Sequence, residues 1–398
     1  MNDDPLPRPA LPRAIWILGF VSLLMDISSE LIHSLLPLFM ATTLAAGPLL
    51  IGIVEGLAEA TALIVKVFSG VLSDYLGKRK ALAVWGYALG ALAKPLFALA
   101  TGIGTVLGAR LIDRVGKGIR GAPRDALIAD LAPQEVRGAA FGLRQSLDTV
   151  GSFLGPMLGI ALMLAWHNDF RAVFWVAVVP AALSVVLLQF GVQEPALSTP
   201  GRRPEALRMA SLRHFDRRYW WVVAIGATFT LARFSEAFLL LRALQGGVPV
   251  AFAPIVLIGM NVVYSLSAYP LGRLSDTVRH TRLLALGMVL LIAADLVLAW
   301  RADAIGLAVG VALWGLHMGA TQGLLARMVA DSAPAPLRGS AFGLFNLASG
   351  IALLMASVLA GGLWERFGAA VTFATGAALA LLALALLGAR PRAVPDAA

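Results

Sequence analysis

The sequence predicts an all-α integral membrane protein with 12 transmembrane helices in two pseudo-symmetric six-helix bundles. Three observations carry this prediction. The chain of 398 residues is 59% hydrophobic and only 14% charged, whereas globular domains average about 45–50% and 25%. Apolar stretches long enough to cross a bilayer recur along the whole chain. Two short motifs of the first half also reappear in the second half at nearly one offset.

The apolar stretches are the first of these elements. A helix needs about 20 consecutive, mostly apolar residues to cross the hydrocarbon core. Pro and Gly punctuate the turns between them, as at Gly47-Pro48 and Ala132-Pro133. We expect spans at residues 14–44, 48–73, 80–101, 104–130, 137–165, 170–191, 219–244, 250–275, 282–300, 304–329, 338–364 and 368–389.

The internal repeat divides these spans into two sets of six. Gly70–Asp74 recurs as Gly272–Asp276, with an offset of 202 residues, and Arg137–Leu143 recurs as Arg338–Leu344, with an offset of 201 residues. Such a repeat predicts two bundles in parallel orientation, related by an axis along the membrane normal. We therefore expect a first bundle over 1–191, a linker over 192–218 and a second bundle over 219–398.

The positive charges predict the orientation. An even number of spans puts both termini on one side, and that side also holds the linker, which carries Arg202, Arg203, Arg208, Arg213, Arg217 and Arg218. The positive-inside rule makes it cytoplasmic, with the protein in the cell inner (plasma) membrane. The net charge of +9 is explained in this way without nucleic acid. The sequence has no Cys, and its five His lack metal-ligand spacing, so we expect neither a metal nor another cofactor.

The fourth span carries a charged stripe that a soluble core would not tolerate. Its members fall within about 140° of one helix face. They are Arg110, Asp113, Arg114, Lys117, Arg120, Arg124 and Asp125. In lipid these side chains must turn toward a water-filled interior. A mostly positive row in that position predicts a solute pathway.

Other spans offer partners for this stripe. The first span has Asp26, Glu30 and His33 on one face, the fifth has Arg144 and Asp148, and the seventh has Arg233 and Glu236. Two interpretations remain open: the cations bind an anionic substrate, or they only neutralise neighbouring carboxylates. We interpret Glu55 and Glu59 of the second span as a structural pair near the outer interface. His317, with Trp314 and Gln322 on the tenth span, is interpreted as lining the cavity.

The loop after the second span resembles motif A of the major facilitator superfamily. The residues that carry the resemblance are Gly70, Asp74, Gly77, Lys78 and Arg79, and Tyr75 departs from the basic residue usual there. The resemblance implies a cytoplasmic gate between the bundles. The basic residues are expected to meet the carboxylates at the end of the fourth span, Asp125 or Asp130, with Arg124 beside them.

Two further stretches are similar to motifs of the same superfamily. Arg114–Gly118 looks like motif B, but Lys117 stands where Gln is usual and Arg120 replaces a small residue, which fits an anionic substrate. The fifth span is similar to motif C, which marks antiporters, notably drug/proton exporters. Its residues are Gly142, Gly151, Gly155, Pro156 and Gly159. The alternative is ordinary packing of small residues with a Pro kink.

The resemblance implies that the first, fourth, seventh and tenth spans line a central cavity. The residues it marks for proton coupling are Asp26, Glu30, His33, Arg114 and Glu236. The residues it marks for the substrate cavity are Arg110, Asp113, Lys117, Arg120, Arg144, Asp148, Arg233 and His317.

These observations favour a secondary transporter that works by alternating access. We expect a proton-coupled exporter of a small organic molecule, anionic or amphipathic, acting as a monomer in the bilayer; the alternative is proton-coupled import of an organic anion. A membrane-embedded prenyl or lipid transferase is less favoured, because the sequence has no Asp-x-x-x-Asp loop and no His-Glu-x-x-His. A receptor or scaffold needs no internal repeat, and the sequence has no nucleotide-binding loop for an ATP-driven pump.

Overall fold

The computed structural model describes residues 10–76, 78–194, 215–274, 277–334 and 337–389, without the side chains of 70, 71, 74–76, 323, 338 and 339. Every regular element within these residues is helical. The first half contains α1 (Arg13–His33), α2 (Leu36–Thr42), α3 (Pro48–Leu76), α4 (Arg79–Ala98), α5 (Ile103–Leu131), η1 (Gln134–Val136), α6 (Arg137–Ala165) and α7 (Phe170–Gly191). The second half contains α8 (Arg217–Ala232), α9 (Ala237–Gln245), η3 (Val250–Phe252), α10 (Ile255–Leu274), α11 (His280–Trp300), α12 (Ala304–Ser332), α13 (Arg338–Phe367) and α14 (Ala369–Gly388).

The predicted spans correspond to these helices. The first span is broken into α1 and α2, and the seventh into α8 and α9. Within the described residues, 11 spans are long and apolar enough to cross a membrane by composition alone. The twelfth span is α5. It is 29 residues long, as α3 is, but it carries the charged stripe. Its length spans the bilayer, while its charges turn away from lipid.

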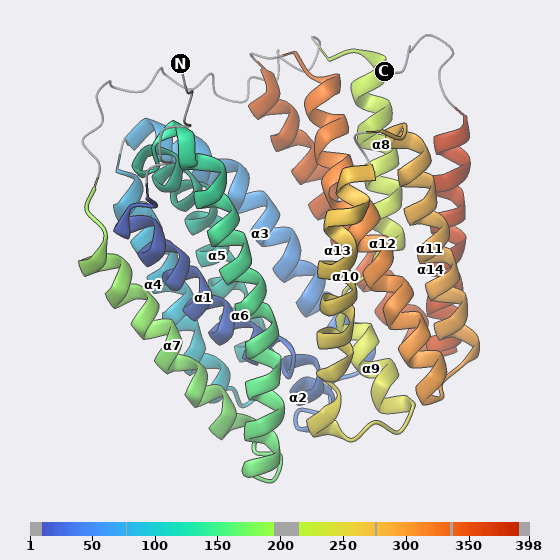
Figure 1. Ribbon diagram of the computed structural model, residues 1–398. Coiled ribbons are helices and arrows are strands. Elements are labelled where there is room, and N and C mark those ends of the chain that lie inside the picture. The colour runs from blue at the N-terminus through green and yellow to red at the C-terminus, as the bar shows by residue number, and fades with distance from the viewer. Residues whose placement is uncertain (1–9, 77, 195–214, 275–276, 335–336, 390–398) are drawn as a thin grey trace, which may run out of the picture.

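The two halves have the same internal packing. In the first half α1 packs on α6 and α7, α3 on α5, and α4 on α5 and α7. In the second half α8 packs on α13 and α14, α10 on α12, and α11 on α12 and α14. Each contact of one half therefore has its equivalent in the other. Figure 1 shows the halves as two bundles, α1–α7 in blue to green and α8–α14 in yellow to red.

The halves meet mainly along α3 and α13, where small residues bring the two backbones together. A Cβ on Gly52 would lie 2.2 Å from the Ser357 carbonyl oxygen, and one on Gly361 would lie 2.5 Å from the Pro48 oxygen. Small residues permit this approach in membranes, where packing rather than the hydrophobic effect joins helices. Ala60 continues the contact against Gly350 at mid-helix.

Among the described residues, the halves close on each other at one end. We call the end at which α1 begins and α14 ends the terminal end, and the opposite one the far end. At the far end α2 packs on α9, and α6 contacts η3 and α10. The Glu365 carboxylate also accepts a hydrogen bond from the Leu49 amide at 3.2 Å, which links α13 to the start of α3. The bundles stand farther apart at the terminal end (Figure 1).

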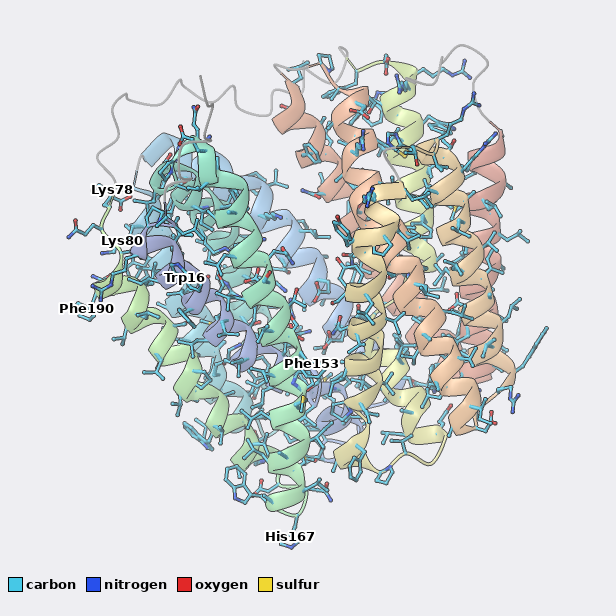
Figure 2. All side chains as sticks on the ribbon, viewed as in Figure 1. Trp16, Lys78, Lys80, Phe153, His167 and Phe190 are labelled. Carbon is cyan, nitrogen blue, oxygen red and sulfur yellow. The ribbon has the colours of Figure 1, made fainter. Side chains whose placement is uncertain are left out.

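The outer surface is apolar in its middle and charged at the terminal end. Val179 and Leu183 in the middle of α7 are 58% and 51% exposed, and Phe190 near the end of that helix is 83% exposed. Lys78 and Lys80 lie toward the terminal end, and His167 lies at the far tip (Figure 2). The exposed aromatic and aliphatic side chains on the outer helix faces match a lipid solvent.

Candidate functional site

A cavity of about 560 Å³ lies between the two halves, toward which α1, α3, α5, α8, α9, α10, α12 and α13 each present side chains. The breaks in the first and seventh spans lie against it, at Pro37 on α2 and at Arg233–Glu236 between α8 and α9. Its lining is Glu30, His33, Pro37, Glu55, Glu59, Leu63, Arg110, Arg114, Lys117, Thr230, Arg233, Phe234, Ser235, Glu236, Ala237, Leu240, Leu257, Trp314, Gln322, Ser349 and Leu353.

The structure brings together about half of the site residues predicted from sequence. Those in the lining are Glu30, His33, Arg110, Arg114, Lys117, Arg233 and Glu236. Those outside it are Asp26, Asp113, Arg120, Arg144, Asp148 and His317. Of the tenth-span residues, Trp314 and Gln322 line the cavity, while His317 is fully buried behind Trp314, with ring centroids 5.5 Å apart.

Two arginines of the stripe are held by α3. Arg110 Nη2 donates to Glu55 Oε2 at 2.6 Å, and Arg114 Nη1 lies 3.1 Å from Glu59 Oε1. Both carboxylates also line the central cavity, which the interpretation as a structural pair near the outer interface did not include. Sequence periodicity places them on one helix face, but only the packing of α3 on α5 shows what that face meets.

This buried pairing gives a stability prediction. Arg110→Met leaves the Glu55 carboxylate without its cation in a buried position, where removing one partner of an ion pair costs about 3–5 kcal/mol. We expect a clearly lower unfolding temperature for the variant purified in detergent. Arg110→Met combined with Glu55→Gln should recover most of the loss, because no unpaired charge remains. A double variant as unstable as the single one would contradict this assignment.

A second chain of contacts leads from the cavity into the first half. His33 Nδ1 lies 3.7 Å from Glu30, and its Nε2 lies 3.4 Å from Asp113 Oδ2. Asp113 accepts a hydrogen bond from Lys94 Nζ at 2.7 Å. Arg114 Nη2 lies 2.8 Å from the His33 ring nitrogens, and a guanidinium can only donate. A neutral His33 therefore accepts from Arg114 on one nitrogen and can carry its proton toward a carboxylate on the other.

Sequence reasoning missed Lys94, which is fully buried on α4 and also donates to Ser29 at 3.0 Å. The available signal was a single Lys in the otherwise apolar stretch 81–101. A lone ammonium at this depth needs a carboxylate partner, and Asp113 is that partner.

Two charges of the stripe, Arg124 and Asp125, form a cluster with Arg144 and Asp148 of α6, outside the cavity lining. Arg144 lies 3.0 Å from Asp148 and 3.7 Å from Asp125. Arg124 lies 3.2 Å from Asp125 and donates to the Ser22 hydroxyl at 3.0 Å. Nearer the terminal end, Arg79 pairs with Asp130, as expected for the motif A loop. Lys78 is exposed. Gly70 and Asp74 belong to α3 by their backbone, but the structure does not describe the surroundings of their side chains. Gly77 and Asp276 lie outside the described residues.

Three charged side chains face the cavity without a fixed partner. The side chains of Lys117, Arg233 and Glu236 make no hydrogen bond or ion pair with the described residues. The Arg233 guanidinium lies 5.9 Å from the Phe229 ring. Arg120 lies outside the lining, with its guanidinium 5.0 Å from the Tyr87 ring. Lys117 comes from the first half, whereas Arg233 and Glu236 flank the break between α8 and α9. Both halves thus present uncommitted charge to one space.

The glycines of the motif C segment bring α6 against the acids of α1. A Cβ on Gly151 would lie 2.9 Å from the Asp26 Cβ, and one on Gly155 would lie 2.8 Å from the Glu30 Cβ. A Cβ on Gly159 would lie 3.4 Å from Cδ1 of Leu35, an ordinary contact, whereas one on Gly142 would meet nothing within 4 Å. Pro156 is buried within α6. The segment therefore fixes the position of the backbone that carries Asp26 and Glu30.

Comparison with known proteins agrees with this architecture. The family model described as Major Facilitator Superfamily matches residues 18–259 and 246–398. The chain is 33% identical to an uncharacterized MFS-type transporter of Methanocaldococcus jannaschii over 95% of this chain and 94% of that protein. It is 25% identical to the inner membrane transport protein YajR of Escherichia coli, over 96% and 83% of the two chains.

Solved structures show the same fold. The peptide transporter POT in complex with sulfate superposes with a TM-score of 0.80 at 14% identity, over 96% of each chain. The whole length of the chain is thus accounted for by one transporter fold, with the charged cavity between its halves. The protein is a membrane transporter and belongs to the Major Facilitator Superfamily.

Proposed function

We propose that this transporter is a proton-coupled exporter of a small amphipathic organic molecule, working by alternating access. The observation that carries the proposal is the two-sided character of the cavity. Its first-half wall is mainly charged, with Glu30, Glu59, Arg114 and Lys117 among its residues, while its second-half wall contributes most of the apolar side chains beside Arg233 and Glu236. The apolar lining there is Phe234, Leu240, Leu257, Trp314 and Leu353. A ligand with one polar and one apolar side fits such a space best.

Glu30 and Glu236 are the proposed coupling acids. Each faces the cavity from a different half, and neither forms a close ion pair among the described residues. A carboxylate with no permanent cation exchanges its proton when charge nearby changes. A substrate group that donates hydrogen bonds to these carboxylates competes with the proton, which is the requirement for antiport.

A second candidate, import of an organic anion with protons, is favoured by the charge balance of the lining. The lining has four carboxylates and four Lys or Arg side chains. Protonation of Glu30 and Glu236 would leave the cations in excess, with Lys117 and Arg233 free to hold an anion. Proton and anion would then bind together, and both would move in the same direction.

One experiment separates these candidates. Purified protein in liposomes containing a pH-sensitive dye is offered anionic, neutral and cationic amphiphiles of one size. Export predicts that substrate moving in one direction drives protons in the other, whereas anion import predicts that both move together. Transport of a substrate with no proton flux of either sign would overturn the proposed coupling.

The absence of Cys from the sequence allows a direct test of orientation. The positive-inside rule puts the terminal end, with Lys78, in the cytoplasm and His167 outside. We expect His167→Cys to react with a membrane-impermeant maleimide on intact cells. Lys78→Cys, also exposed, should react only after permeabilisation. The reverse pattern would invert the topology, and the cavity would then open to the outside.

A further inference from the structure

The second half contains a buried carboxyl group that the charge network of the first half does not explain. Asp295 of α11 is fully buried, and neither of its carboxyl oxygens has a hydrogen-bond partner in the described part of the chain. His317 of α12 is likewise fully buried, with both ring nitrogens unpartnered. By contrast, Asp113, equally buried in the first half, is bound by Lys94.

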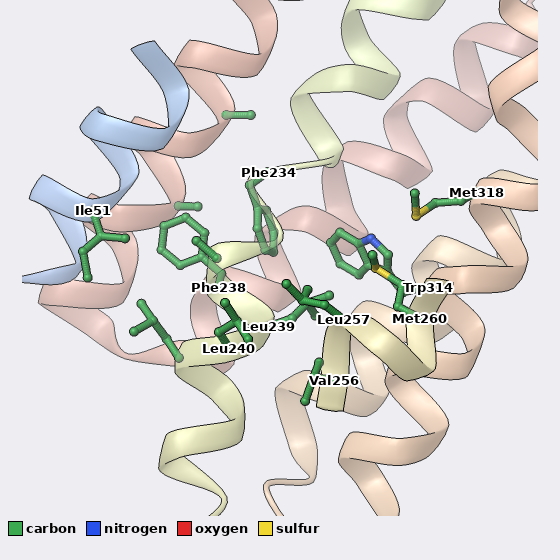
Figure 3. Packing of buried hydrophobic residues seen from close by; sticks show 14 of the residues in the cluster. Ile51, Phe234, Phe238, Leu239, Leu240, Val256, Leu257, Met260, Trp314 and Met318 are labelled. Carbon is green, nitrogen blue, oxygen red and sulfur yellow. The ribbon is translucent and has the colours of Figure 1, made fainter. Parts of the chain in front are cut away.

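The environment of Asp295 is made of small and aromatic residues. A Cβ on Gly376 of α14 would lie 2.6 Å from Asp295 Oδ2 and 3.0 Å from Cε1 of Phe234. The Phe234 ring lies 5.6 Å from the Trp314 ring, and Trp314 in turn lies 5.5 Å from His317. Figure 3 shows Phe234 at the turn between α8 and α9, with Trp314 opposite it.

This arrangement puts Asp295 next to the cavity but screened from it. Phe234 and Trp314 both line the cavity, and they contact, on their other sides, the surroundings of Asp295 and His317. Phe234 lies in the non-helical break between α8 and α9, so its position depends on a joint rather than on a continuous helix.

Few charged groups surround this position. Helix α14 has no titratable residue, and α12 contributes His317, with Arg327 and Asp331 farther along toward its end. The α8–α9 break contributes Arg233 and Glu236, which face the cavity. Helix α9 contributes Arg242, which donates to the Ala299 carbonyl of α11, and α11 itself carries His280 and Arg282 in its first turn. None of these forms an ion pair with Asp295. An ionised carboxylate placed here would lose its hydration without compensation, at a cost of several kcal/mol.

We propose that Asp295 is a proton-binding site of the second half, covered by Phe234 and Trp314 and opened to the cavity when the α8–α9 break moves. The carboxyl group binds one proton from cavity water in the open state and holds it as the neutral acid in the closed state. The proton returns to water when the site reopens. The inference deepens the proposed proton coupling and rests on it for its role in transport.

The test reads the proton directly by infrared spectroscopy. We expect wild-type protein at neutral pH to show a C=O stretching band of a protonated carboxylic acid that is lost in Asp295→Asn. The matched control is Glu135→Gln, which removes an exposed carboxylate and should leave the band intact. Gly376→Ala offers a second variant, since its methyl group would displace the carboxyl oxygen and shift the band without removing it.

Deuterium exchange then separates a functional site from an inert buried acid. In D₂O the Asp295 band should shift when substrate is added, because turnover exposes the group to the cavity. A band that persists in Asp295→Asn, or one that never shifts during turnover, overturns the inference. Failure of the proposed coupling would look different, since wild-type protein would then show no substrate-driven proton flux while the infrared band remained measurable.

Discussion

Glu30→Gln is expected to abolish transport driven by a pH gradient while leaving exchange of substrate across the membrane measurable. Gln has the size and hydrogen-bonding reach of a protonated Glu but cannot gain or lose a proton. Glu30 lines the cavity, and the contact of Gly155 with its Cβ fixes its position. The variant should therefore still rock between its two states with substrate bound, but without coupling this movement to protons.

The measurement is accumulation of substrate in liposomes with only a pH gradient imposed, compared with counterflow in the same liposomes. Asp26→Asn serves as the comparison, since Asp26 lies on the same helix face but outside the cavity lining. We expect a smaller effect there. Uphill accumulation by a protein that carries both substitutions would place the coupling site elsewhere.

Gly52→Ala is expected to slow transport strongly, because it disrupts the contact that closes the far end. The added Cβ would lie 2.2 Å from the Ser357 carbonyl oxygen of α13, a backbone atom that cannot turn aside. The two helices must separate, so the variant should transport at least about tenfold more slowly if closure is worth more than about 1.4 kcal/mol. Insertion into the membrane should be unaffected, since Ala favours a helix.

Gly142→Ala is the matched control, because the same substitution there meets nothing within 4 Å. Initial transport rates of the two variants, normalised to the amount of inserted protein, provide the comparison. Equal rates would show that α3 and α13 tolerate separation and that closure at the far end does not depend on their close contact.

Much of the fold can be predicted from local sequence properties. Apolar length specifies most spans, and the repeat of Gly70–Asp74 at Gly272–Asp276 indicates two similar halves. Helix α5 fails a test based on composition, yet its stripe reveals it because the charges share one face. The break at Arg233–Glu236 was not predicted, since it contains no Pro or Gly that would interrupt a helix. The break at Ser34 is followed at once by Pro37 in the first turn of α2, a signal that the prediction of the spans did not use.

The site was harder to predict because its chemistry depends on distances between helices. Sequence identified Arg110 and Arg114 as charged and inward-facing, but not that Glu55 and Glu59 are close enough to pair with them. It also overstated the free positive charge, since most of the stripe is committed to carboxylates. The glycines of α6 were better predicted. Their spacing indicated close packing, and the structure shows that Asp26 and Glu30 lie against two of them.

The dependence of α5 on its neighbours has a consequence for how the protein is made. On insertion scales, each charged residue at mid-bilayer costs about 2.5–3.5 kcal/mol, so α5 alone would be rejected by the bilayer. Its partners Glu55, Glu59 and Lys94 lie on α3 and α4, which precede it in the chain and so leave the ribosome first. Insertion of α5 into the membrane therefore requires that α3 and α4 are already inserted. Variants at Glu55 or Lys94 should be degraded during biogenesis, before their assembly is complete.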